Sequence, residues 1–234
     1  MPDLIESARA ILVSSELRAR SSAQDIANSS TAAYKQQISF AQILEEGERD
    51  GLPATRFATQ FVQGRLTHTG RDLDLAIVGP GLLQMRDGES LIYSRGGSFV
   101  RGPDGTIADE RGRVLQQAGG GDLVAAGEQV EIVSDGTVLA NGMPVAAVGI
   151  FETSAPGAVE ALGGSLYGVP LDAIIEAEVS SLRQGYLESA NVVLSDELVA
   201  MMTASRQAES GARISQVYDQ LIGQAITTFG RGTQ

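Results

Sequence analysis

The chain contains no cysteine and no tryptophan. Without cysteine it can form no disulfide, thiolate nucleophile, or Cys-ligated zinc or iron–sulfur centre. Aromatic residues make up only 5% of the 234 residues, and 28 glycines interrupt the chain. The core must therefore come mainly from Val, Leu, Ile and Ala, and the mixture favours many turns beside some long helix.

Basic residues are also scarce. Seventeen Lys and Arg stand against 29 Asp and Glu, which gives a formal net charge of −12, and most of the excess acid lies in the middle of the chain. Nucleic-acid binding draws on clustered Lys and Arg that displace counterions. We therefore expect no nucleic-acid partner.

Long apolar runs are missing as well. No stretch is apolar over the length that a bilayer-spanning helix needs, and Glu6, Arg9 and Glu16 interrupt any secretory apolar region near the N-terminus. We expect no membrane insertion and no cleaved signal peptide, so export would use another route.

Residues 1–35 predict a long helix with a narrow seam. Small and apolar residues alternate there at spacings of three and four, the a and d pattern of a helix that packs lengthwise on another helix. The seam residues are Ile5, Ala8, Leu12, Ser15, Ala19, Ser22, Ile26 and Ser29. Small residues let helix axes approach closely but bury little apolar area. The helix should therefore depend on a partner, and packing on its own domain is the alternative interpretation.

A second helix is expected over residues 186–234. Its seam residues are Leu194, Leu198, Met201, Ala208 and Ala212, followed slightly out of phase by Ile214, Val217, Leu221, Ala225 and Thr228. Gly211 and Gly223 each cost about 1 kcal/mol relative to Ala in a helix interior, so this helix also needs partners. Two weak helices at opposite ends of the chain predict a coiled-coil-like paired core.

Residues 70–170 between the helices predict a β domain. Short strand-like runs there are separated by turn dipeptides, and nothing helical of comparable length intervenes. These dipeptides are Asp87-Gly88, Asp104-Gly105, Asp135-Gly136 and Asn141-Gly142. We expect a mostly antiparallel β domain and an α+β fold. Residues 36–69 should form an irregular connector, and residues 171–185 a return connector.

Candidate reactive residues are isolated in the sequence. His68 is the one histidine and has no nucleophile or second ligand nearby. Asp72 and Asp74 could begin a carboxylate metal site, but the apolar residues 75–77 stand where a calcium loop needs oxygen ligands and glycine. We expect no catalytic residue, no cofactor, no metal and no enzymatic activity.

Three local strings stand in the order helix, β domain, helix. Residues 25–35 read DIANSSTAAYK, residues 73–85 read LDLAIVGPGLLQM and continue to YSRGGSF at residues 93–99, and residues 185–192 read GYLESANV. Together they resemble the flagellar rod and hook protein family and bracket nearly the whole chain. Ala33 stands where that family usually has Gly, and Leu82-Leu83 where it usually has an aromatic pair.

The positions that match the family motifs lie in all three strings. They are Asn28, Thr31, Tyr34, Lys35, Leu73, Leu75, Gly79, Gly81, Tyr93, Arg95, Gly97, Phe99, Gly185, Leu187, Glu188, Asn191 and Val192.

The resemblance implies a structural subunit of the bacterial flagellar basal-body rod. Such a subunit assembles with itself and with other rod proteins into a hollow helical shaft that transmits torque and leaves a channel for export. The terminal helices would line the tube and the β domain would lie outside. The resemblance further implies secretion by the flagellar export apparatus without cleavage, a rod cap as partner, and a place in the periplasm-spanning rod.

Two alternatives accompany this interpretation. The short middle region and the chain length suit a proximal rod protein, and the distal-rod paralogue is the alternative within the family. From a different class, the chain could be a secreted β-rich adhesin or polysaccharide-binding module. Only six Phe and five Tyr are available as aromatic platforms for a glycan.

Overall fold

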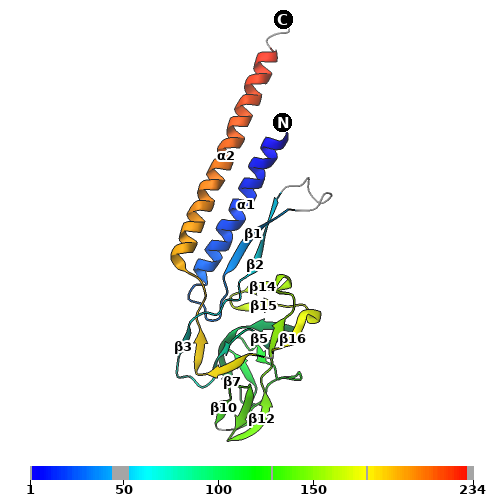
Figure 1. Cartoon of the computed structure of the whole chain (residues 1–234), viewed down its shortest axis with the longest axis vertical. Helices are drawn as coiled ribbons and strands as arrows, with labels where there is room; N and C mark the ends of the chain where they lie inside the picture. Colours follow the sequence, from blue (N-terminus) through cyan, green and yellow to red (C-terminus); the bar gives the residue numbers. More distant parts are fainter. Residues whose placement is uncertain (1, 44–52, 128, 178, 231–234) are drawn as a thin grey trace. The chain divides into compact units, whose positions relative to one another are not determined.

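A computed structural model describes residues 2–43, 53–127, 129–177 and 179–230 (Figure 1). The chain divides into two compact units, which we call the helical unit and the β unit. The helical unit comprises Met1–Ile26, Gln37–Phe57 and Val193–Gln234, and the β unit comprises Ala27–Gln36 and Ala58–Val192. The chain therefore passes from one unit to the other after residues 26, 36, 57 and 192.

The helical unit contains two long helices and a two-stranded sheet. Helix α1 spans Pro2–Ala27 and α2 spans Leu194–Gly230, and the two run side by side in opposite directions (Figure 1). Strands β1 (Gln37–Ile43) and β2 (Pro53–Thr59) pair with each other. The backbone N–H of Gln37 donates to both carboxylate oxygens of Asp25, at 3.2 and 3.3 Å, which ties the start of β1 to the end of α1.

Neither described helix has an apolar stretch long enough to cross a membrane. The first turn of α2 carries Asp196 and Glu197, where negative charge is favourable beside the unpaired N–H groups of a helix N-terminus.

The β unit contains the remaining strands. They are β3 (Leu66–His68), β4 (Asp74–Val78), β5 (Leu82–Asp87), β6 (Ser90–Ser94), β7 (Gly96–Arg101), β8 (Ile107–Asp109), β9 (Val114–Leu115), β10 (Val130–Ile132), β11 (Thr137–Ala140), β12 (Met143–Ala147), β13 (Ile150–Thr153), β14 (Glu160–Gly163), β15 (Leu166–Gly168), β16 (Ile174–Glu176), β17 (Ser181–Gln184) and β18 (Tyr186–Glu188). Two 3-10 helices, η1 (Pro156–Ala158) and η2 (Leu171–Ala173), lie among them.

One large sheet dominates this unit. Its strand order is β14-β15-β6-β5-β9-β8-β7-β4-β17, and β13 joins it through β5 and carries β16 on its other side. Three further strands, β10-β11-β12, form a separate sheet, and β18 pairs with β3. Every strand pair whose register is described in this unit is antiparallel. The expected α+β class with a mostly antiparallel β domain is confirmed.

The predicted turn dipeptides do join strands. Asn141 and Gly142 both have positive φ, 51° and 79°, and connect β11 to β12 with Ala140 opposite Met143. Two adjacent residues of positive φ are what a type I′ hairpin turn requires, and Asn-Gly supplies them at least cost. Asp104-Gly105 and Asp135-Gly136 likewise lie between consecutive strands, and Asp87-Gly88 begins at the last residue of β5 and leads to β6.

The core of the β unit is aliphatic, as the composition predicts. Its main cluster includes Leu75, Ile77, Leu83, Ile107, Leu115, Leu123, Val138 and Leu182, with Phe99 as its one aromatic ring. A second cluster surrounds Tyr93 and Tyr167, and Phe61 meets Tyr167 edge-on at 5.2 Å between ring centroids.

The expected boundaries differ from the observed elements at the connectors. Residues 36–69 are not irregular, because they contain β1, β2 and β3. The return connector at residues 171–185 supplies β16 and β17, and β17 pairs with β4 from Ser181 opposite Val78 to Gln184 opposite Leu75. These short strands have little local strand signal, and pairing with a preformed neighbour determines them. Helix α1 also ends earlier than expected, and α2 begins later.

Candidate functional site

The helix pair is built on buried residues spaced seven apart, and all of them except Glu197 are small. On α1 the buried positions include Ala8, Ser15 and Ser22, and on α2 they are Glu197, Ala204 and Gly211. A spacing of seven keeps one face of a helix toward an antiparallel partner over several turns. The pair therefore packs through small side chains, which favour a short distance between the helix axes.

Gly211 fixes the register of this pair. A Cβ at Gly211 would lie 3.0 Å from Leu12 Cγ and 3.3 Å from the carbonyl oxygen of Ala8. Because the helices are antiparallel, equal steps of seven from this contact bring Ser15 toward Ala204 and Ser22 toward Glu197. Gly211, which the sequence suggests only as a helix weakness, is thus a close contact between the helices.

The seam residues expected from the sequence are distributed unevenly. Ala8 is buried, whereas Leu12, Ala19, Ile26, Met201 and Ala208 are half-buried, and Ile5, Leu194, Leu198 and Leu221 are exposed. The exposed fractions of Leu194, Leu198 and Leu221 are 48%, 42% and 58%. On α2 the large apolar residues therefore do not fill the contact with α1.

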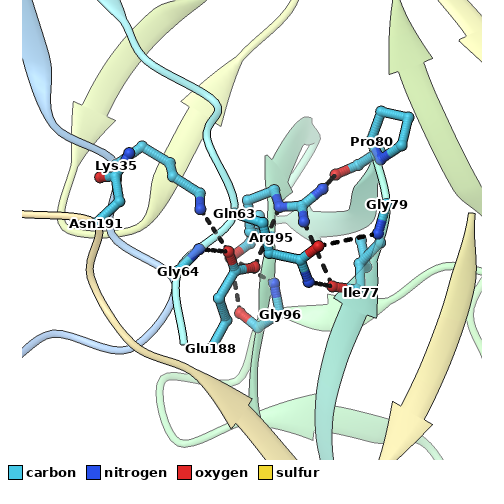
Figure 2. Close-up of polar contacts among 12 residues, drawn as sticks. Lys35, Gln63, Gly64, Ile77, Gly79, Pro80, Arg95, Gly96, Glu188 and Asn191 are labelled. Carbon is cyan, nitrogen blue, oxygen red and sulfur yellow. Dashed lines mark hydrogen bonds and ion pairs between the residues drawn. The ribbon is translucent and has the colours of Figure 1, made fainter. Parts of the chain in front are cut away.

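In the β unit, the carboxylate of Glu188, the last residue of strand β18, lies at the centre of a buried ionic cluster. Glu188 Oε1 accepts hydrogen bonds from Lys35 Nζ at 2.5 Å and from the backbone N–H of Gly64 at 2.6 Å. Glu188 Oε2 accepts one from Arg95 Nε at 3.3 Å (Figure 2). The side chains of Lys35 and Glu188 are 0% exposed and that of Arg95 is 2% exposed. We call these three residues the ionic junction.

The two cations have further acceptors. Lys35 Nζ donates to the carbonyl oxygen of Val62 at 2.7 Å, and Arg95 donates to the carbonyl oxygens of Gly81 at 2.6 Å and Ile77 at 3.4 Å. Buried charges are tolerated only when their donors and acceptors are satisfied in this way. Burial lowers the pKa of Lys35 below its ordinary value, and the hydrogen bond and charge of Glu188 offset only part of that effect.

Backbone hydrogen bonds around the ionic junction connect three segments of the chain. The N–H of Ala33 donates to the carbonyl of Glu188 at 2.7 Å. The N–H of Gln36 donates to Asn191 Oδ1 at 2.7 Å, and Asn191 Nδ2 donates to the carbonyl of Gln60 at 2.8 Å. Residues 33–36, 60–64 and 188–191 are thereby held together. Each of these segments adjoins a point where the chain passes between the two units.

Comparison with known proteins finds similarity to flagellar basal-body rod proteins along most of the chain. Residues 183–228 match the family described as flagellar basal body rod FlgEFG protein C-terminal. The flagellar basal-body rod protein FlgF of Caulobacter vibrioides is 26% identical over 221 residues, which cover 89% of this chain and 90% of that protein. FlgF of Rhizobium meliloti is 24% identical and is covered over 92% of both chains. FlgG of Bacillus subtilis is 29% identical, over 77% of this chain and 72% of that protein.

Over about nine tenths of its length, the chain is similar to flagellar basal-body rod proteins. Its three family strings meet at the ionic junction, because Lys35 ends the first string, Arg95 lies in the second and Glu188 lies in the third. The contacts between them span 153 and 93 residues of sequence. The three strings lie far apart in the sequence but meet at one position in the fold.

The other positions that match the family motifs mostly have structural roles in the β unit. Tyr34, Leu75, Tyr93 and Phe99 are buried, whereas Leu73, Leu187, Asn191 and Val192 are half-buried. In the first string, Thr31 Oγ1 donates to Asn28 Oδ1 at 3.3 Å. Gly79, Gly81 and Gly185 all have positive φ, a conformation that costs a residue with a side chain roughly 1–2 kcal/mol. Gly97 differs, since it lies inside β7.

Ala33 explains one departure from the family pattern. Its φ is 62°, in the left-handed region where glycine carries no steric cost. The family's usual Gly at this position therefore fits the turn, and this chain adopts the same turn with an alanine. An alanine gives no local sign of this conformation in the sequence, unlike the Asn-Gly dipeptide at residues 141 and 142.

His68 and Asp74, the candidate reactive residues of the sequence, make their described contacts with residues outside the ionic junction. The His68 ring packs edge-on against Tyr186, with ring centroids 4.9 Å apart. Asp74 accepts hydrogen bonds from Thr69, Ser98 and Arg71 and so forms part of the sheet. Within the described residues, no group of three or more His, Asp or Glu could hold a metal ion.

Proposed function

We propose that this chain is a structural subunit of the flagellar basal-body rod that assembles with itself and with other rod proteins into a hollow axial shaft, and that it is not an enzyme. The observation that carries the proposal is the meeting of all three family strings in one buried ionic junction. The FlgF relatives, which this chain matches over about nine tenths of its length, are themselves named as rod proteins.

The helix pair suits a component that is completed by its neighbours. Large apolar residues of α2 are left exposed, and the hydroxyl of Ser15 is buried without a hydrogen-bond partner within the described part of the chain. An unsatisfied buried polar group costs about 1–3 kcal/mol, and small seam residues contribute little burial to offset it. We propose that neighbouring subunits cover the exposed face, so that a coiled-coil-like core becomes stable only in the assembly.

The ionic junction suits a part that bears load. A shaft subunit has to carry force between segments that enter and leave the β unit. The ionic junction and the hydrogen bonds beside it connect three such segments through paired charges instead of a flexible loop. In this proposal the terminal helices form the inner tube, the β unit lies outside, and the ionic junction keeps the chain segments from separating under torque.

Export and location follow from the same proposal. A rod subunit has to reach the periplasm-spanning rod, and we propose that it does so through the flagellar export apparatus, without a cleaved signal peptide and with a rod cap as an assembly partner. Isolated protein should then show fast amide exchange over residues 1–30 and 195–228 beside a protected β unit. Strong protection of both helices in a proven monomer would contradict assembly-coupled ordering.

Deletion and complementation test the function directly. A strain without this gene should be non-motile and should lack complete rods in electron cryomicroscopy of isolated basal bodies, and the intact gene should restore both. Purified basal bodies should contain the chain. Normal rods and normal swimming in the deletion strain would contradict the proposal.

Position within the rod separates the two family alternatives. The FlgG relative shares 29% identity but covers a smaller part of this chain than the FlgF relatives do, which favours a proximal position. Basal bodies arrested before the distal rod forms should still contain the chain. Its absence from such particles would favour the distal-rod paralogue.

A further inference from the structure

We propose that the β unit carries two complementary faces, a cationic stack at Arg183 and an acidic apolar face at Glu152, and that these faces join successive copies of this chain. The inference rests on the proposed rod function and names the contact between copies outside the helices. Both faces belong to the β unit, and each is described from its own contacts.

The first face is a stack of three side chains on β17, β18 and β3. The guanidinium carbon of Arg183 lies 5.5 Å from the centroid of the Tyr186 ring, and that ring packs against His68. Arg183 is exposed, and within the described residues it has no carboxylate partner. The aromatic ring restricts the guanidinium, so less side-chain entropy is lost when it binds a carboxylate. Tyr and Arg are also the residues that most often dominate binding energy at protein interfaces.

The second face lies in a segment that contains no cation. Between Arg113 and Arg183 the sequence has no Lys, Arg or His, and its acidic residues are Asp122, Glu128, Glu131, Asp135, Glu152, Glu160, Asp172, Glu176 and Glu178. Asp122 pairs with Arg86, and the other carboxylates of the segment that the structure describes have no ion-pair partner among the described residues. The segment therefore favours a partner that presents arginine.

Within this segment, β13 and β16 place a carboxylate beside exposed apolar groups. Ile175 lies opposite Glu152 in the antiparallel register, and directly opposite residues project from the same face of a sheet. Ile175 is 50% exposed, and Leu171 and Val179, which flank β16 in sequence, are more exposed still. β16 pairs with β13 alone, so one edge of it has no strand neighbour among the described residues.

The occupant that fits both faces is a second copy of this chain. A face whose carboxylate, Glu152, has no ion-pair partner among the described residues complements an unpaired arginine supported by aromatic rings, and one chain supplies both. Two different patches that meet make a heterologous contact, which extends into an open helical array when the rotation does not close. A rod needs that kind of contact, whereas a contact of one patch with itself would stop at a dimer.

Charge reversal in the flagellated cell tests the contact. In a strain expressing only the variant chain, Arg183→Glu and Glu152→Arg should each lose most of the swimming zone and most of the rods, because like charges then face each other. The double variant should regain both. Two matched controls should swim like the wild type: Glu176→Arg, which projects from the opposite face of the same strand pair, and Arg111→Glu, another exposed arginine of the β unit.

The lack of native cysteine allows a second measurement that does not depend on charge. Ile175→Cys and Ser181→Cys are made in separate copies, which are co-expressed and treated with a short bismaleimide in isolated basal bodies. A crosslinked dimer should form in the mixture and not with either variant alone. A dimer from Ile175→Cys alone, or no dimer although rods contain both copies, overturns the proposal. Single reversals that swim normally also overturn it, and so does a defect that only a change in another rod protein repairs.

These outcomes leave the rod function separately testable. Loss of rods in the deletion strain supports that function whatever Arg183 does. Normal rods in the deletion strain would contradict the function itself, and a failure of the charge-reversal pair alone would contradict only this contact.

Discussion

At the scale of single residues, the ionic junction depends on one carboxylate. Glu188→Gln would leave Lys35 and Arg95 buried and close together without a counter-charge. Removing one partner of a buried ion pair costs about 3–5 kcal/mol, so we expect a loss of that order in the free energy of unfolding of the β unit, measured by urea denaturation. Arg86→Gln removes a partly exposed pair with Asp122 and should cost less than about 1 kcal/mol. Equal losses of unfolding free energy in the two variants would contradict the claim that the buried ionic junction stabilises the β unit more than a partly exposed ion pair does.

Ala33 offers a change in the opposite direction. At φ 62° an alanine carries a strain of about 1 kcal/mol that glycine does not. Ala33→Gly should therefore stabilise the β unit slightly, although the greater freedom of glycine in the unfolded chain reduces the gain. Ala32→Gly is the neighbouring control and should destabilise. Chemical denaturation of both variants measures the difference, and a loss of stability in Ala33→Gly would contradict the argument from strain.

At the scale of elements, the two glycines of α2 make a matched pair. An alanine at Gly223 meets no atom within 4 Å, whereas one at Gly211 meets Leu12 and the backbone of Ala8. Gly223→Ala should raise the stability of α2 by about 1 kcal/mol through helix propensity. Gly211→Ala should lose that gain or reverse it, because the helices must move apart. Circular dichroism at 222 nm during thermal unfolding compares them, and equal gains would mean that the close packing is not needed.

The elements also show where sequence reasoning succeeds and where it stops. Turn dipeptides such as Asn141-Gly142 determine their hairpins locally, so the antiparallel β domain could be predicted. The ionic junction could not, because Lys35 and Glu188 are 153 residues apart and only the fold brings them together. The contact face of α2 was equally hidden, since Gly211 determines it and the larger apolar residues lie elsewhere. β17 forms a strand because it pairs with the edge of β4, and no local sequence pattern reveals this pairing.

At the scale of the whole molecule, stability should fall steeply in acid. Burial alone would raise the pKa of Asp74, but hydrogen bonds from Ser98, Thr69 and Arg71 hold it below the ordinary value. Hydrogen bonds from Arg86 and Gln116 lower the pKa of Asp122. Because these pKa values are lower in the folded state, the unfolded chain takes up protons first as the pH falls.

Their stabilising contribution is therefore fully present above about pH 4, the ordinary range of an aspartate pKa, and is lost as the pH falls through the folded values. We expect the free energy of unfolding, measured by urea denaturation, to be level from pH 7 to about pH 5 and to decline below pH 4. Asp74→Asn should be less stable at pH 7 and should flatten the decline, since its amide does not titrate. A decline of unchanged steepness in Asp74→Asn would show that other carboxylates govern the acid limit of the subunit.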